Sequence, residues 1–217
     1  AVAIAAQVGA KRCDIYTDVD GVFTTDPKVV SNAKKLDSIT MEEMLELAGQ
    51  GAKVMQTRAV EFANKYKVPV RVLSSFNEGD GTLISLKDDG MENALISGIA
   101  FQKDQVKFTL HGVGDIPGTA FKILGPISEK DIEVDVIVQN VSVDGKTDFT
   151  FTVSKDDESD VKDIIEEIKK EVEFKDLMIN SDIAKVSLVG VGMRTHAGIA
   201  SKAFKALSEN GVNIQII

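Results

Sequence analysis

The residues whose types and spacing could do chemistry lie first in the segment 17–27, which is rich in turn formers and small oxygen-bearing side chains. Its carboxylates could hold Mg²⁺ or accept hydrogen bonds from a ribose and an adenine, and Lys28 and Lys53 could neutralise phosphate charge. A nucleotide-binding loop is one interpretation of this segment. A polar surface loop with solvated lysines is the other, and from the pattern alone the two weigh about equally.

A strand is expected just before this segment, and two helices and a second strand after it. Residues 12–16 and 70–73 have the short apolar character of buried strands. Thr40 and Glu43 form the pattern of a capping box at a helix start, and a second helix is expected over residues 58–66. This order predicts an α/β domain, in which ligands bind beyond the carboxyl ends of the strands. The polar segment after the first strand occupies that place.

The second half of the chain contains an internal repeat at an offset of 80 residues, which aligns 106–112 with 186–192 without a gap. Each copy is expected to fold as a strand, a Gly-containing turn, a helix and a strand. The first copy continues with a strand at 147–153 and a helix at 160–172, which completes a βαββαβ unit. The second copy stops within the strand expected at 213–217.

Composition excludes several classes of protein. The formal net charge of −9 argues against broad contact with nucleic acid or an anionic membrane, and no apolar stretch approaches the ~18 residues of a membrane span. Cys13 is the only cysteine, so no intrachain disulfide and no cysteine-based metal site can form. His111 and His196 fall at different points of the repeat and support no metal pair, so no metal ligand is assigned. A cytoplasmic location is expected.

The polar segment and the residues after it resemble the aspartokinases. The resemblance begins with the run Ile15 to Lys28, read as IYTDVDGVFTTDPK, and extends over essentially the whole chain. The matching segments that follow are 35–36, 42–48, 51–54, 58–61, 74–77 and 81–84. It implies that residues 1–88 are the C-terminal part of an amino-acid kinase α/β domain.

The same resemblance implies an ATP site with Mg²⁺ as cofactor. Phe23 would lie against the adenine where the family usually has Tyr, and Lys28 stands at a position that is usually Arg. Lys53 would be the catalytic residue, stabilising charge on the transferred phosphoryl group. The implied nucleotide-binding residues are Thr17, Asp18, Phe23, Asp26, Lys28, Lys53 and Val54.

The reaction implied is the phosphorylation of L-aspartate by ATP to 4-phospho-L-aspartate, in the biosynthesis of lysine, threonine and methionine. The family's Lys-Phe-Gly-Gly start, its aspartate contacts and its Gly-Gly-Ser-Asp segment are not in this sequence. Both ends of the chain are expected to be cut, since it has no initiator Met and ends within a strand pattern. Phosphoryl transfer needs both substrates and the metal in place, so the chain alone is expected not to catalyse.

The repeat resembles ACT domains, the amino-acid sensors that follow the kinase domain in aspartokinases. This implies α+β ferredoxin-like domains, the first at 94–180 and a second, truncated one at 181–217. The turn 114–118 resembles the ACT ligand loop: a helix N-terminus would bind the ligand's carboxylate, and Asp115 its ammonium. The implied effector residues are Asp115, Ile116, Pro117, Gly118, Asp135, Gln139, Asn213 and Ile214. From the pattern alone, helix capping is the commoner use of such a turn.

Two other functions fit parts of the sequence. A regulatory subunit without chemistry would bind an amino acid, but it is not expected to begin with a nucleotide loop. A haloacid-dehalogenase-like phosphatase would use Asp18 as nucleophile and Asp20 as general acid and base, but residues 87–90 are a poor substitute for its metal cluster. The repeat and the continuous resemblance favour the aspartokinase. Its expected effector is lysine, threonine or both, and its ACT domains are expected to form a homo-oligomer.

Overall fold

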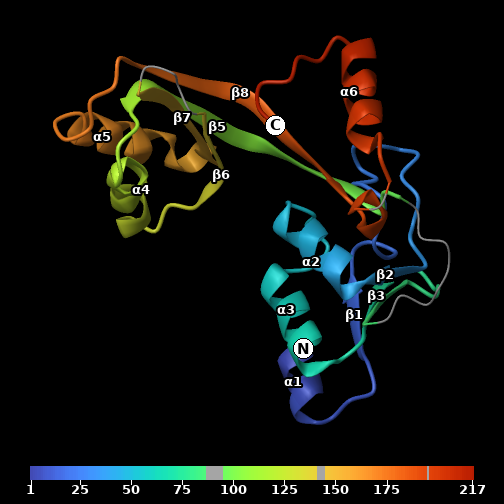
Figure 1. Cartoon of the computed structure of the whole chain (residues 1–217). Helices are drawn as coiled ribbons and strands as arrows, with labels where there is room; N and C mark the ends of the chain where they lie inside the picture. Colours follow the sequence, from blue (N-terminus) through green and yellow to red (C-terminus); the bar gives the residue numbers. More distant parts are fainter. Residues whose placement is uncertain (87–94, 141–144, 195) are drawn as a thin grey trace. The chain divides into compact units, whose positions relative to one another are not determined.

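The computed structural model describes residues 1–86, 95–140, 145–194 and 196–217 (Figure 1). They form two compact units, of which the first comprises residues 1–101 and 186–217 and the second residues 102–185. Two long strands, β5 (Gly98–Gly114) and β8 (Asp176–Val189), each contribute residues to both units. Positions 88 and 94, where domain boundaries are expected, and the segment 87–90 lie outside the described residues.

The first unit contains a four-stranded mixed sheet with the spatial order β1-β3-β4-β2. Its strands are β1 (Cys13–Thr17), β2 (Ser38–Thr40), β3 (Val70–Ser74) and β4 (Thr82–Ser85). The pairs β1–β3 and β2–β4 are parallel, whereas β3 and β4 are antiparallel. Its helices are α1 (Val2–Gln7), α2 (Met41–Gly49), α3 (Thr57–Tyr66) and α6 (Ile199–Glu209), with a short 3₁₀ turn η2 (Val191–Arg194) before α6.

Local sequence accounts for these elements. The Thr40 hydroxyl accepts from the Glu43 amide at 3.2 Å, and the Glu43 carboxylate accepts from the Thr40 amide at 3.3 Å, so the predicted capping box is confirmed. Met44 of α2 and Val60 of α3 pack with the fully buried Val72 of β3 in one apolar core. The expected strands and the second helix match β1, β3 and α3 to within one residue.

The second unit is a βαββαβ fold. Between β5 and β8 it adds α4 (Thr119–Glu129), β6 (Val134–Gln139), β7 (Lys146–Ser154), a 3₁₀ turn η1 (Lys155–Asp157) and α5 (Glu158–Ile168). The sheet order is β6-β7-β5-β8, and β7 pairs antiparallel with both β5 and β6. This is the order of a ferredoxin-like sheet, so the predicted fold class is confirmed.

Aromatic and branched side chains fill the core of the second unit. The rings of Phe108 and Phe151 stack with centroids 5.4 Å apart. Ile123 of α4 and Ile165 of α5 are fully buried beside them. The helix expected over 160–172 ends earlier, at Ile168, and the chain continues through a further turn.

The repeat is visible in the backbone. Helices α4 and α6 begin and end at positions 80 residues apart. Each follows a glycine in the left-handed region, Gly118 with φ 93° and Gly198 with φ 90°, where a side chain would be strained.

The strand expected at 213–217 is absent, because residues 212–217 form no strand in the structure. In the first copy β6 is held by β7, and the described part of the second copy has no strand equivalent to β7. No helix in the described part of the chain is long and apolar enough to cross a bilayer.

Candidate functional site

The carboxyl ends of β1 and β3 lie side by side. Thr17 and Ser74 are register partners, and the Ser75 amide donates to the Thr17 carbonyl at 2.8 Å. Asn77 Nδ2 donates to Asp20 Oδ1 at 2.9 Å, and this bond lowers the pKa of Asp20, with a smaller contribution from Ser74. The turn after β3 therefore holds the loop after β1, at the edge of the sheet where ligands of α/β folds bind.

Four of the predicted nucleotide-binding residues are joined in this nucleotide loop (residues 17–28). The Thr17 hydroxyl donates to Asp18 Oδ1 at 3.2 Å, and Lys28 Nζ lies 3.5 Å from Asp18 Oδ2. Asp26 Oδ1 accepts from the Lys28 amide at 2.8 Å. The Thr17 hydrogen bond, and then the charge of Lys28, lower the pKa of Asp18. The side chains of Lys28 and Asp18 are 73% and 67% exposed, so both can turn to meet a ligand.

The base of the loop is anchored in the core. The fully buried Thr82 accepts from the Val22 amide at 2.8 Å and donates to the Leu36 carbonyl at 2.5 Å. Gly21 passes so close that a Cβ there would lie 2.4 Å from the Thr82 hydroxyl oxygen. The nucleotide loop therefore has exposed charges at its tip and a buried anchor at its base.

The remaining predicted nucleotide residues flank this loop in different ways. Phe23 is half-buried and forms an antiparallel bridge with Lys35. Lys53 is exposed in the connection between α2 and α3, and its neighbour Val54 packs against the core of the first unit. Within the described ranges, no group of three or more His, Cys, Asp or Glu side chains could hold a metal ion.

Sequence reasoning assigned no role to Asn77, Ser74 or Thr82. Ser74 Oγ accepts from the Phe76 and Asn77 amides at 3.3 and 3.2 Å, which orients Asn77 toward Asp20. Polar residues directly after a predicted strand are a signal that could have identified this pair. No local signal identifies Thr82, because its partner Val22 lies 60 residues away in the sequence.

The predicted amino-acid site begins at the effector turn (residues 114–118) between β5 and α4. Asp115 Oδ1 accepts from Gln139 Nε2 at 3.3 Å, and the Asp115 amide donates to the Gly145 carbonyl at 2.9 Å. Gly118 is the N-cap residue of α4 and no side chain caps the helix. Ile116 is 64% exposed, and Pro117 beside it is exposed too. An uncapped helix end, a carboxylate and a side-chain amide thus meet at one exposed turn.

The other predicted effector residues belong to other elements of the chain. Asp135 is on β6, where it forms an ion pair with Lys185 of β8. Asn213 and Ile214 belong to the first unit and follow α6.

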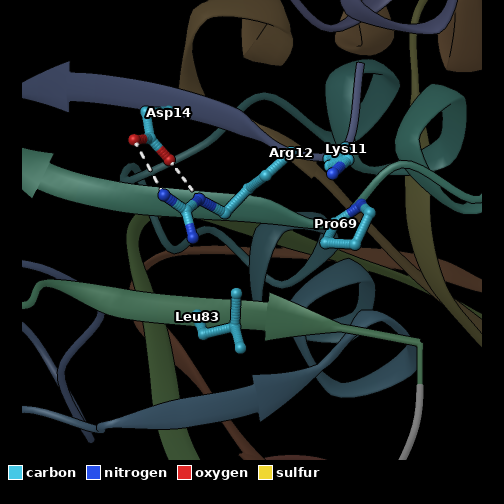
Figure 2. A pocket seen from close by; sticks show the side chains of 5 residues that line it. All are labelled: Lys11, Arg12, Asp14, Pro69 and Leu83. Atoms are coloured by element: carbon cyan, nitrogen blue, oxygen red, sulfur yellow. Dashed lines mark hydrogen bonds and ion pairs between the residues drawn. The ribbon is translucent and has the colours of Figure 1, made fainter. Parts of the chain in front are cut away.

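A shallow pocket at the opposite end of β1 contains none of the predicted site residues (Figure 2). It is lined by Lys11, Arg12, Asp14, Pro69 and Leu83. Asp14 accepts from Arg12 Nε at 2.7 Å and from Arg71 Nη2 at 2.6 Å. Arg71 first and Arg12 second lower the pKa of Asp14, so this carboxylate is paired with two guanidinium groups at the start of the sheet.

Known families match the two halves of the chain in the predicted order. The amino acid kinase family model matches residues 1–74, and two ACT domain models match residues 110–173 and 186–217. An aspartate kinase of Stutzerimonas stutzeri is 57% identical over 217 residues, and one of Pseudomonas fluorescens is 58% identical. All of this chain is covered but only 53% and 52% of those proteins, so the chain spans about half the length of the curated relatives it matches.

Solved structures agree with these matches. The aspartate kinase of Clostridium acetobutylicum covers 100% of this chain at 30% identity and a TM-score of 0.87, with 50% of that protein covered. The structure of E. coli aspartokinase III in complex with aspartate and ADP is 28% identical with a TM-score of 0.81, and 48% of that chain is covered. The structure of the same enzyme in complex with lysine and aspartate is 29% identical with a TM-score of 0.75, and 47% of that chain is covered.

Some solved structures are covered over most of their own length. A structure of aspartokinase alpha and beta subunits is 43% identical with a TM-score of 0.52, and 56% of this chain covers 80% of that chain. Together with the kinase and ACT matches in their expected order, this similarity shows that the chain belongs to the aspartokinase family.

Proposed function

We propose that this chain carries the ATP-binding loop and the amino-acid-sensing region of an aspartate kinase, which phosphorylates L-aspartate to 4-phospho-L-aspartate. The observation that supports this most is the cluster of Thr17, Asp18 and Lys28 at the joined carboxyl ends of β1 and β3. The relative from E. coli binds aspartate and ADP, which is consistent with a nucleotide at this edge.

The residues of the loop have distinct proposed roles. Thr17, Asp18 and Asp26 offer oxygens to the ribose and the adenine, and Phe23 presents a half-buried ring to the adenine. Lys28 can leave Asp18 to pair with a phosphate, because the two exposed groups are 3.5 Å apart and cost little to separate.

Lys53, with Val54 beside it, is proposed to line the phosphate end of the site. Its ammonium would stabilise the charge that develops on the transferred phosphoryl group. A Mg²⁺ ion would neutralise charge on the β- and γ-phosphates, held chiefly by their oxygens. The exposed, ionised carboxylate of Asp20 fits the one or two protein ligands that such an ion takes.

The sensing role is proposed for the repeat. The amides at the start of α4 would bind the carboxylate of lysine or threonine, and Asp115 and Gln139 would bind its ammonium. The E. coli relative binds lysine. We assign residues 1–88 to the kinase domain, 94–180 to the first ACT domain and 181–217 to the second, and propose that the edges of the ACT sheets pair in a homodimer.

Titration calorimetry with Mg·ADP tests the nucleotide proposal. Asp18→Asn and Lys28→Ala are each expected to weaken binding by roughly tenfold, since each removes one charge-assisted contact. Lys34→Ala is the matched control, because it removes an exposed lysine from the same connection and leaves the Thr24–Lys34 backbone bond in place. Losses for Asp18→Asn and Lys28→Ala no larger than the loss for Lys34→Ala would overturn the proposed roles, because the two loop residues would then matter no more than a surface lysine.

A purely regulatory subunit is the second candidate. The ligand-free regulatory subunit of the Thermus thermophilus aspartate kinase is 33% identical, and 82% of it is covered. Amino-acid binding with no detectable Mg·ADP binding would favour this candidate over the first.

A further inference from the structure

A buried carboxylate outside the nucleotide loop joins three segments of the first unit. Glu43 is only 5% exposed. Its Oε2 faces the start of α2 and accepts from the amide and the hydroxyl of Thr40 at 3.3 and 2.9 Å. Its Oε1 accepts from the Ser97 hydroxyl and from the Val191 amide, the latter at 3.3 Å. A capping box needs only the first oxygen, so the second serves another purpose.

The segment 97–99 leads from this carboxylate to the nucleotide loop. The Ile99 amide donates to the Thr24 carbonyl at 2.7 Å. Between Ser97 and Ile99, a Cβ on Gly98 would lie 2.9 Å from a Leu47 methyl and 3.3 Å from the Thr24 oxygen. The absence of a side chain therefore lets α2 and the loop close directly on this segment.

The same segment is fixed to the beginning of the second repeat. The Ser97 amide donates to the Val189 carbonyl at 2.7 Å. A Cβ on Gly190 would lie 2.5 Å from the Leu95 carbonyl oxygen, so the backbones are in contact there. At the other end of α2, the Ser187 hydroxyl donates to Gln50 Oε1 at 2.9 Å. The segment that opens the second repeat, from Ser187 to Val191, thus bonds to α2 near both of its ends.

We propose that Glu43 and Ser97 form a positioning junction, which transmits displacements of residues 189–191 in the second repeat to the nucleotide loop through Ile99 and Thr24. The backbone bonds of Ser97 and Ile99 are 2.7 Å long, and the Ser97–Glu43 bond is buried. At Gly98 and Gly190 the neighbouring segments approach so closely that a Cβ would clash, which restricts independent movement of the segments. The consequence for catalysis rests on the proposed nucleotide role of the loop. Glu43 itself touches no substrate and acts through its partners.

Amide hydrogen exchange of the whole chain, without ligand, tests the junction. Ser97→Ala removes one donor to Oε1, and the amides of Thr24, Ile99 and Val191 are expected to exchange about tenfold faster. Thr40→Ala removes one donor to Oε2 and is the matched control for capping. It is expected to accelerate the first turn of α2 while Thr24 and Ile99 stay within about twofold.

Two further variants complete the design. Ser187→Ala breaks the hydroxyl bond at the far end of α2, outside the route through Glu43, and should leave the Thr24 amide within about twofold. Ser97→Thr retains the hydroxyl and should restore slow exchange at Ile99. If Ser97→Ala and Thr40→Ala accelerate the same amides, or if Ser97→Ala leaves Thr24 unchanged, the junction is refuted.

A parallel titration with Mg·ADP separates this inference from the proposed function. Weaker Mg·ADP binding by Ser97→Ala than by Ser187→Ala would support both the junction and the nucleotide role of the loop. A parent chain that binds no Mg·ADP would overturn the nucleotide role of the loop, while the exchange pattern would still decide whether the junction exists.

Discussion

The nucleotide loop and the effector turn use the same pair of groups in different surroundings. In the first unit Asn77 donates to Asp20 at 2.9 Å, and in the second Gln139 donates to Asp115 at 3.3 Å. The nucleotide loop rests on Thr82, which is fully buried. In the effector turn residues 115–118 are exposed. The turn is held by backbone contacts, by the Gln139 bond and by the half-buried Thr119, whose hydroxyl donates to the Gly114 and Ile116 carbonyls at 3.1 and 3.0 Å.

This difference separates a site with a preformed base from one that adapts. Burying the anchor fixes the path of the nucleotide loop before any ligand arrives, which reduces the entropy lost on binding. The Thr119 hydroxyl that holds the effector turn is only half-buried, so under the proposed sensing role a bound amino acid would be able to reshape the turn. A sensor needs that freedom, because a ligand shifts an equilibrium only if it binds two arrangements differently.

The largest expected effect is on the anchor of the nucleotide loop. Thr82→Val leaves the Val22 amide and the Leu36 carbonyl without their buried partner, so the free energy of unfolding should fall by about 2–3 kcal/mol. Urea unfolding, monitored by hydrogen exchange in each unit, measures this free energy. The loss of stability should be confined to the first unit. Thr82→Ser keeps the hydroxyl and should cost under about 1 kcal/mol. Equal losses in the two variants would mean that the hydroxyl does not anchor the loop.

Asp115→Asn should act on binding and leave folding unchanged. Loss of the charge opposite the ligand's ammonium is expected to weaken the binding of the amino-acid effector by about 10–50-fold, at nearly constant thermal stability. Calorimetry with L-lysine and L-threonine measures the effect. Glu129→Gln removes the same charge at the other end of α4 and should change affinity less than about twofold. A drop in stability without a change in affinity would make Asp115 a structural residue of the turn.

Acid should weaken the first unit through Asp14. Arg71 and Arg12 hold the pKa of Asp14 below its ordinary value. The contribution of Asp14 to the free energy of unfolding is therefore fully present above its unfolded-state pKa, near pH 4. It is lost as the pH falls through the folded-state pKa. Asp14→Asn should therefore lower the free energy of unfolding by about 1 kcal/mol at pH 7 and by little at pH 3. Urea unfolding at the two pH values checks this, and an equal loss at both would contradict the ionic account.

The second unit should show a smaller version of the same effect. The Gly112 amide first and His111 second lower the pKa of Asp148, which accepts from that amide at 3.0 Å. The Asp148 side chain is 49% exposed, so solvent screening limits its contribution to under about 1 kcal/mol. Asp148→Asn should slightly reduce stability above pH 4 and have no effect near pH 3. A loss of unfolding free energy as large as that of Asp14→Asn would contradict the limit that solvent screening sets for Asp148.

Patterns contained in a few neighbouring residues predicted the structure well. The capping box of Thr40 and Glu43 and the paired glycines Gly118 and Gly198 depend on local backbone chemistry, which the sequence states directly. The polar loop that contains Thr17 and Asp18, and Lys28 after it, could be singled out for the same reason, because they lie in one short segment. Their nucleotide role stays a prediction.

Features that depend on distant partners were missed or wrong. Thr82 meets Val22 across 60 residues, and Glu43 meets Val191 across 148, so neither contact leaves a local signal. The apolar pattern at 213–217 predicted a strand, but a strand needs hydrogen bonds from a neighbour, and none of the described strands takes that place.

Hydrogen exchange with one ligand at a time tests the central distinction between the two sites most directly. Mg·ADP should slow exchange in residues 17–28 and 74–77, and the bound amino acid should slow exchange in residues 114–119 and 139. Each ligand should leave the directly contacted residues of the other site unprotected. Protection of the effector turn by Mg·ADP, or no protection of the nucleotide loop at saturating Mg·ADP, would contradict the assignment of nucleotide and amino acid to separate sites.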